Sequence, residues 1–169
     1  VIEGRITAEA GSLTFLSRLL EQYRPEVIIE IGTYTGGLSI HFGLYGALKG
    51  IPVHTWDIED KRQNNRIFHA LDIQFHLDDC FSAKSDELIK SLLKTKRALV
   101  FCDGGNKIKE FNYYSDLLKN GDIICCHDFA VDKDTFDRDV YLKSWGWHEI
   151  SWADISGAVA RNGLKIIEP

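Results

Sequence analysis

The 169-residue chain lacks several features that would assign it to a common class of protein. It has no apolar run near the roughly 20 residues of a membrane helix, and no charged-then-apolar signal precedes its first helical pattern. It also lacks a basic excess, since 20 Lys and Arg stand against 25 Asp and Glu, for a net charge of −5. A broad nucleic-acid surface would be basic. We therefore expect a cytoplasmic protein with a small-molecule substrate and with neither a nucleic-acid nor a membrane partner.

Cysteines are few, and their spacing does not suit metal or redox chemistry. The four are Cys80, Cys102, Cys125 and Cys126, and none of them forms the C-x-x-C pair of zinc or thiol–disulfide motifs. Three of them lie in apolar runs typical of strands, so we expect reduced, buried thiols. A chain of this length buries roughly 70% of its unfolded surface and needs no disulfide for its core.

The most informative segment is an apolar run that leads into a glycine loop, VIIEIGTYTGG over residues 27–37. Its first five residues are β-branched apart from Glu30 and too few for a helix, which predicts a buried parallel strand. The three glycines allow a tight turn and a close approach of the backbone to a ligand. The Glu-x-Gly-x-x-x-Gly spacing differs from the Gly-x-Gly-x-x-Gly of dinucleotide sites. The loop therefore suits a ligand without a pyrophosphate, such as an adenosine that bears an amino-acid tail.

Helical and strand patterns alternate along the chain. We expect helices over 12–23, 38–49, 60–70, 85–93 and 107–118, and strands over 27–31, 53–57, 73–77, 98–103 and 122–128. A charged loop or helix over 132–143 precedes two final strands over 147–152 and 158–167, the latter broken by Asn162-Gly163 as in a hairpin. The alternation predicts one α/β domain over 1–169, with an N-terminal segment and helix over 1–24 and a Rossmann-like core over 25–169. Its sheet is doubly wound and mostly parallel, with helices on both faces and the ligand across the carboxyl ends of the strands.

Acidic residues stand at the ends of the first three strands. Glu30 lies among isoleucines, where a carboxylate is costly unless it caps loop amides or binds a cationic ligand group. It is either a ligand residue, direct or through water, or a structural carboxylate that holds the loop. Asp57 ends the second strand, where an acid can accept both hydroxyls of a ribose. Its alternative is an ordinary solvated acid. Asp79 follows the third strand and suits the exocyclic amine of an adenine.

The fourth and fifth strands end in a second group of polar residues, Asp103, His127 and Asp128. Neighbouring strands bring their carboxyl ends to one crevice, and two carboxylates with an imidazole can hold a divalent cation there. Magnesium prefers oxygen ligands, so His127 is either a ligand or a base. The alternative is a pair of strand-end acids bonded to loop amides.

Taken in order, these segments resemble the class I S-adenosylmethionine-dependent methyltransferases. Within that class they are most similar to the branch of cephalosporin hydroxylase-like proteins and metal-dependent O-methyltransferases of sugars and small molecules. The resemblance covers about residues 25–130. It is carried by Glu30-Ile31-Gly32-Thr33-Tyr34-Thr35-Gly36-Gly37, Asp57, Asp79, Phe101-Cys102-Asp103-Gly104-Gly105 and the segment 117–129.

The resemblance implies a sheet of seven strands, of which the last is antiparallel, and it implies roles for the residues. Glu30 and Gly32 would lie beside the methionine part of the cofactor, Asp57 at the ribose, and Asp79 with Cys80 at the adenine. The implied cofactor-binding set is Glu30, Gly32, Thr33, Tyr34, Gly36, Gly37, Asp57, Asp79, Cys80 and Asp103. The implied metal ligands are Asp103, His127 and Asp128.

The branch often reads Asp-Gly-Asp-His after the fourth strand, whereas this chain reads Asp103-Gly104-Gly105-Asn106. The usual histidine is absent, so Lys107 and His127 are the candidates for the general base. The function that follows is methyl transfer from S-adenosylmethionine to a small hydroxylated acceptor, a sugar or a phenolic, assisted by Mg²⁺ or another divalent cation. The alternatives are a noncatalytic cofactor-binding module of a larger assembly and, less favoured by the glycine spacing, an NAD-dependent oxidoreductase.

Overall fold

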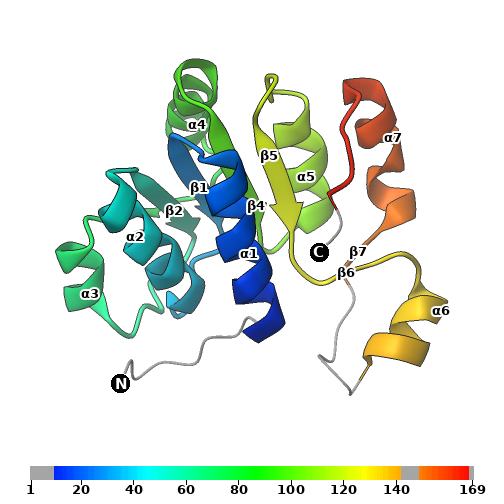
Figure 1. Cartoon of the computed structure of the whole chain (residues 1–169), viewed down its shortest axis with the longest axis horizontal. Coiled ribbons are helices and arrows are strands. Elements are labelled where there is room, and N and C mark those ends of the chain that lie inside the picture. The colour runs from blue at the N-terminus through cyan, green and yellow to red at the C-terminus, as the bar shows by residue number, and fades with distance from the viewer. Residues whose placement is uncertain (1–9, 142–148, 168–169) are drawn as a thin grey trace.

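A computed structural model of the chain describes residues 10–141 and 149–167, and its centre is a five-stranded parallel sheet (Figure 1). The strand order is β3-β2-β1-β4-β5. The strands are β1 (Val27–Ile31), β2 (Val53–Asp57), β3 (Gln74–Leu77), β4 (Ala98–Cys102) and β5 (Ile123–Cys126). The expected Rossmann-like α/β sheet is confirmed, and all five strands lie within about two residues of their expected bounds.

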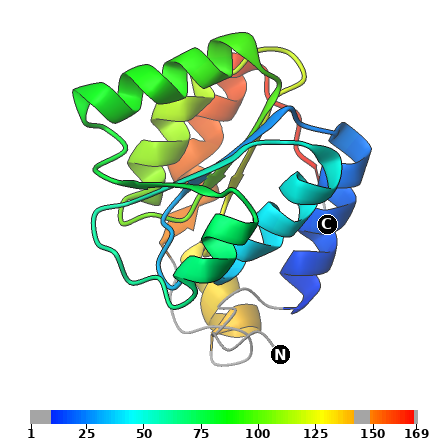
Figure 2. The same cartoon turned by 90° about the vertical axis from the view of Figure 1, so that its left-hand side faces the viewer.

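Helices cover both faces of this sheet, as Figure 2 shows from the side. One face carries α1 (Ala10–Tyr23), α2 (Gly37–Lys49) and α3 (Asn65–Ala70), and the other carries α4 (Ala83–Thr95) and α5 (Lys107–Ser115). Side chains alternate along β1, so Ile28 joins the first hydrophobic cluster and Ile29 joins the second. Every residue of β1 is buried, which explains its continuous apolar pattern. Among the described helices, none is both long and apolar enough to cross a membrane.

The carboxyl-terminal part differs from the expectation. A strand was expected over 158–167, but the chain forms α7 (Trp152–Asn162), which packs against α5. The Asp154 carboxylate accepts the Ser151 N–H (2.8 Å) and fixes the start of α7, and Ile155 and Ala158 bury one face of the helix. Gly163, at φ 58°, ends this helix rather than forming a hairpin turn. The apolar residues therefore follow a helical period.

The expected seven-stranded sheet is also wrong within the described residues. The short strand β7 (Ile150–Ser151) pairs in parallel with β6 (Phe129–Ala130), and these two form a separate sheet rather than an antiparallel edge of the main one. Between them lie α6 (Lys133–Thr135) and the π-helical turn η1 (Phe136–Val140), where a charged loop or helix was expected. Residues 142–148, which include the start of the first expected final strand, lie outside the described residues.

The four thiols are unpaired by disulfides, as expected, and Cys80 and Cys102 are buried while Cys125 and Cys126 are partly buried. Burial raises the pKa of Cys125 and of Cys126 to about 12, so neither thiol ionises near neutral pH. This agrees with a structural rather than a reactive role.

The turn after β1 requires a glycine at position 32. Gly32 has φ 95°, and a Cβ added there would lie 2.2 Å from the Asp103 carbonyl oxygen. Its N–H donates to the Trp56 carbonyl oxygen (2.8 Å). The turn is thereby packed between the ends of β2 and β4, and it has no room for a side chain.

We predict that Gly32→Ala lowers the free energy of unfolding by about 2 kcal/mol or more, since it combines a strained φ with a backbone clash. Gly157→Ala is the matched control, because Gly157 lies in α7 with nothing within 4 Å of the added Cβ. That variant should be stabilised by roughly 0.5–1 kcal/mol. Urea unfolding of the two variants checks both values, and equal stabilities would contradict this account of the turn.

Candidate cofactor and cation site

The segments that follow four parallel strands gather at one edge of the sheet. Beyond the strand ends, the Asp103 N–H donates to the Ile31 carbonyl oxygen (2.8 Å) and the His127 N–H donates to the Cys102 carbonyl oxygen (3.0 Å). The sheet hydrogen bonds thus continue past β4 and β5 into the loops. In Figure 1 the arrow of β5 points toward this edge, where β6, β7 and α6 also lie. A ligand site is expected at such an edge of an open α/β sheet.

Asp57 binds the backbone of the glycine loop. Its Oδ2 accepts the Tyr34 N–H (2.8 Å), and its Oδ1 accepts the Glu59 N–H (3.1 Å). Tyr34 has φ 46°, an uncommon conformation for a residue with a side chain, and its ring is 54% exposed. The structure therefore places Asp57 beside the glycine loop. Each carboxylate oxygen can accept a further bond, so a ribose contact is still possible in this arrangement and stays a prediction.

Glu30 lies beneath the loop as a buried carboxyl, 1% exposed. Its Oε2 accepts hydrogen bonds from the hydroxyls of Ser39 on α2 and Thr55 on β2, the latter at 2.6 Å. The Thr33 hydroxyl extends this chain, 2.6 Å from the Thr55 oxygen. Burial raises the pKa of Glu30 to about 8. These contacts support the structural alternative for Glu30, and its role toward a ligand stays a prediction.

Thr55 and Ser39 are site residues that the sequence reasoning missed. Thr55 could have been found, because it pairs in register with Glu30 across β1 and β2. Its side chain must then point to the same face of the sheet as that of Glu30.

The segment after β3 presents Asp79 at the surface and Cys80 in the core. Asp79 Oδ1 accepts the Phe81 N–H (2.9 Å), while the Cys80 carbonyl oxygen accepts the Tyr114 hydroxyl (3.1 Å). Burial raises the pKa of the Cys80 thiol to about 12. Asp79 is exposed and can meet a ligand, whereas Cys80 offers at most an apolar contact. The adenine contacts stay predictions.

The structure brings Asp103, His127 and Asp128 together, with one ligand atom from each lying within 4.8 Å of the others. His127 Nδ1 is 3.0 Å from Asp128 Oδ1 and 3.4 Å from Asp103 Oδ1. Asp128 is only 4% exposed and has φ 54°. Although His127 is near, Asp128 Oδ1 accepts no hydrogen bond of acceptable geometry within the described part of the chain. A buried carboxylate oxygen in that condition fits a cation ligand.

Lys107 enters the same cluster from the first turn of α5. Its side chain is 5% exposed, and its Nζ lies 3.1 Å from Asp128 Oδ2 and 3.4 Å from Asp103 Oδ1. It also donates to the Glu149 carboxylate and to the Gly104 carbonyl oxygen (3.3 Å). Burial alone would lower the pKa of Lys107, but the hydrogen bond to Glu149 and the charges of Asp103 and Asp128 raise it above its usual value. An ammonium so stabilised is unsuited to the role of general base.

His127 is also a cation in this arrangement. The carboxylates of Asp103 and Asp128, which lie close to its ring nitrogen, raise the pKa of His127 to about 10. Burial would raise the pKa of Asp128, but His127 and Lys107 hold it below its usual value. The imidazole can serve as a base only after it loses this proton. Ligation of a metal would require the loss of the same proton.

The carboxylate that binds loop amides here is Glu110, another buried residue that sequence reasoning missed. Glu110 accepts the N–H groups of Gly104 (3.1 Å) and Asn106 (3.1 Å). Burial raises the pKa of Glu110. Bonding to loop amides was the alternative role expected for the strand-end acids, and in the structure Glu110 has that role. Asp103 and Asp128 contact the cationic side chains instead.

Glu149 is a further residue beside the cluster that sequence reasoning missed. It precedes β7, and its N–H donates to the Asp128 carbonyl oxygen (3.2 Å) while its carboxylate contacts Lys107. It stands 42 residues after Lys107 in the chain. No local pattern marks Glu149, because its position results from the pairing of β6 with β7.

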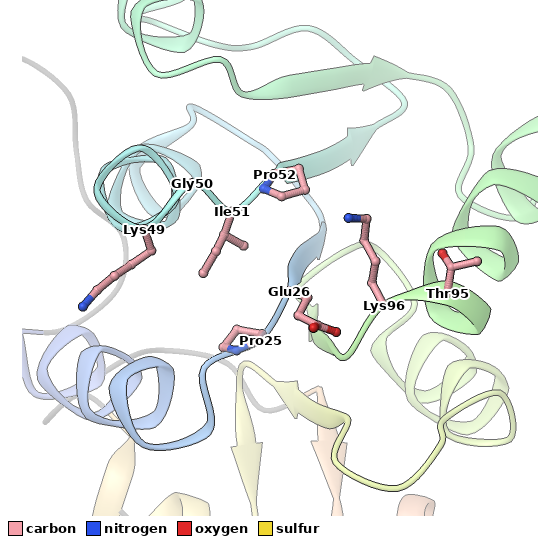
Figure 3. A pocket seen from close by; sticks show the side chains of 8 residues that line it. All are labelled: Pro25, Glu26, Lys49, Gly50, Ile51, Pro52, Thr95 and Lys96. Carbon is pink, nitrogen blue, oxygen red and sulfur yellow. The ribbon is translucent and has the colours of Figure 1, made fainter.

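A separate hollow of about 410 Å³ lies at the opposite edge of the sheet (Figure 3). Its lining comes from the segments just before β1 and β2 and from the ends of α2 and α4. The lining residues are Pro25, Glu26, Lys49, Gly50, Ile51, Pro52, Thr95 and Lys96. Because the strands are parallel, this hollow is remote from the carboxyl edge and contains none of the predicted site residues.

Solved structures of other proteins share this fold. The chain is similar to CmcI in its apo form, with 18% identity and a TM-score of 0.67 over 95% of this chain and 65% of that one. It is similar to CmcI with Mg and SAM, with 21% identity and a TM-score of 0.60 over 75% of this chain and 55% of that one. A putative caffeoyl-CoA O-methyltransferase from Staphylococcus aureus matches with 18% identity and a TM-score of 0.57, over 72% and 58% of the two chains.

The chain thus spans between 55% and 65% of the length of the CmcI structures. No protein-family model matches the sequence, and no curated protein does. At these identities the likeness establishes the fold alone, a Rossmann-like α/β sheet.

The buried carboxyl of Glu30 predicts a pH dependence of stability. The folded protein retains a proton on Glu30 up to a pKa of about 8, whereas the unfolded chain releases it near 4.5. The free energy of unfolding should therefore fall as pH rises from about 5 to about 8. Glu30→Gln removes this contribution, and the wild type should lose on the order of 2–4 kcal/mol relative to the variant over that range.

Chemical denaturation at intervals of pH measures the difference. Glu87→Gln, at an exposed position on α4, is the control and should keep the wild-type slope. Parallel curves for wild type and Glu30→Gln would show that burial does not raise the pKa of Glu30.

Proposed function

We propose that the chain is an S-adenosylmethionine-dependent O-methyltransferase, of the EC 2.1.1 class, acting on a small hydroxylated acceptor such as a sugar or a phenolic. The observation that carries the proposal is the placement of the glycine loop 32–37 beside Asp57 and the cluster of Asp103, His127 and Asp128. All lie at the carboxyl edge of a sheet whose fold is that of class I methyltransferases. We further propose a cytoplasmic location, with no nucleic-acid or membrane partner.

The residues of this edge divide into a cofactor part and an acceptor part. The loop residues Gly32, Thr33, Tyr34, Gly36 and Gly37 would lie along the methionine end of the cofactor, above Glu30. Asp57 would accept the ribose hydroxyls, and Asp79 with Cys80 would border the adenine. Asp103 would lie between the two parts, because its carbonyl contacts the loop at Gly32 while its carboxylate belongs to the cluster.

Methyl transfer requires the acceptor oxygen to be held in line with the sulfonium methyl group. Asp103, His127 and Asp128 would hold a divalent cation such as Mg²⁺, which when bound lowers the pKa of an acceptor hydroxyl. If His127 is not a ligand of the cation, its imidazole would take the acceptor proton after losing its own proton. Lys107 would not act as the base, since its pKa is too high.

A noncatalytic module that binds the cofactor is the second candidate function. One observation favours it: Lys107 and His127, the two candidate bases, are both cationic near neutral pH in this arrangement. Such a module would bind S-adenosylmethionine without turnover on any acceptor. An NAD-dependent oxidoreductase is disfavoured by the loop spacing, which has no place for a pyrophosphate.

We expect calorimetry to detect binding of S-adenosylhomocysteine by the wild type, and Asp57→Asn to weaken it. Loss of a charge-assisted ribose contact should cost roughly 1.5–3 kcal/mol, or about tenfold to a hundredfold in affinity. The asparagine oxygen still accepts one N–H of the loop, which limits the structural effect. Thermal unfolding of the variant checks that it remains folded.

Asp60→Asn is the matched control, because Asp60 is exposed three residues away and pairs with Arg62 (2.7 Å). It should leave the affinity unchanged. No binding heat from the wild type would overturn the proposed function. Wild-type affinity in a folded Asp57→Asn protein would remove only Asp57 from the site.

A further inference from the structure

Lys107 is a buried ammonium placed among three carboxylates, Asp103, Asp128 and Glu149. We propose that Lys107 is the built-in counter-cation of this cluster, so that a divalent cation binds Asp103 and Asp128 only in competition with it. The proposal rests on the cation site put forward above, and it does not require that the chain transfers methyl groups.

The first support is that Lys107 uses the same oxygens as the candidate metal ligands. Lys107 Nζ and His127 Nδ1 both lie 3.4 Å from one oxygen, Asp103 Oδ1. Asp128 is shared as well, with Oδ2 3.1 Å from Lys107 and Oδ1 3.0 Å from His127. An ion bound between the two aspartates would meet the ammonium at both carboxylates.

The second support is the balance of charge in a buried place. The cluster joins three carboxylates to the ammonium of Lys107, whose side chain is only 5% exposed. A divalent ion added beside this buried ammonium would be repelled by it, in surroundings where water screens poorly. Binding therefore requires that Lys107 withdraw from Asp103 and Asp128.

Glu149 gives Lys107 a place to withdraw to. Its side chain is 44% exposed, so it stands at the rim of the cluster, and it already contacts the ammonium. On withdrawal Lys107 can stay paired with Glu149 while the aspartates change partner. Glu149 is thus a positioning residue, which lowers the cost of exchanging the ammonium for a metal ion.

The chain offers a matched control on the same helix. Lys109 is exposed, and its Nζ lies 3.6 Å from the centroid of the Phe81 ring, away from the cluster. Replacing Lys109 removes one positive charge from α5 without vacating the place between the aspartates. Lys107→Arg, in turn, changes the side chain at that place but keeps the charge.

The test is a calorimetric titration with Mn²⁺ alone. The proteins compared are the wild type and the variants Lys107→Met, Lys107→Gln, Lys107→Arg and Lys109→Gln. Lys107→Met and Lys107→Gln should bind Mn²⁺ about tenfold more tightly or better, because the competing ammonium is gone. The wild type, Lys107→Arg and Lys109→Gln should bind weakly. Added Mn²⁺ should also raise the thermal unfolding midpoint of Lys107→Met by more than that of the wild type.

Equal affinities in the wild type and in both neutral variants at position 107 would overturn the proposal, and so would no binding by any protein. A gain in Lys109→Gln as large as in Lys107→Met would show a general effect of charge and would overturn it too. If Lys107→Met does not fold without metal, Lys107→Gln carries the comparison; failure of both to fold even with Mn²⁺ also counts against the proposal. Because no cofactor is present, these outcomes are separate from S-adenosylhomocysteine binding, which tests the proposed function.

Discussion

The close approach of Gly32 to the Asp103 carbonyl is the constraint on which the rest of the candidate site depends. A Cβ on Gly32 would lie 2.2 Å from that carbonyl oxygen. The Asp103 N–H donates to the Ile31 carbonyl oxygen (2.8 Å), which holds the end of β1 against the end of β4. The loop that follows Gly32 is then anchored to β2 through Asp57, and the carboxylate of Asp103 faces the end of β5. One backbone contact thus places the glycine loop and the acid cluster at the same edge of the sheet.

The buried carboxyls around that edge are stabilised in three different ways. Glu30 is surrounded by apolar strands and accepts two hydroxyls, and burial favours its protonated form. Glu110 accepts two backbone N–H groups from the loop after β4. Asp128 is compensated by Lys107 and His127. The first two shape the backbone, whereas the third creates a charged cluster whose partners can be exchanged. Exchangeable charged partners are therefore concentrated around Asp128.

The parts of the fold that could be predicted are those with strong local patterns. β1 and β4 are buried on both faces, so their continuous apolar runs identify them without tertiary information. The carboxyl-terminal residues 158–167 were misassigned, because a short apolar run fits both a strand and a helix, and Gly163 serves equally as a turn or a helix end. The closeness of Asp103, His127 and Asp128 could be predicted, because chain order predicts that the ends of β4 and β5 are adjacent. The contact between Lys107 and Glu149 could not be predicted, since it depends on the pairing of β7 with β6.

The central claim is that the carboxyl edge of the sheet, and not another part of the surface, binds an adenosyl cofactor. The most direct measurement is a crystal structure of the protein with S-adenosylhomocysteine. The account predicts adenosine density over the loop 32–37, with the ribose within hydrogen-bonding distance of Asp57 and the amino-acid end above Glu30. Density in the opposite hollow between Pro25 and Lys96 (Figure 3), or a cofactor that leaves the loop uncontacted, would contradict it.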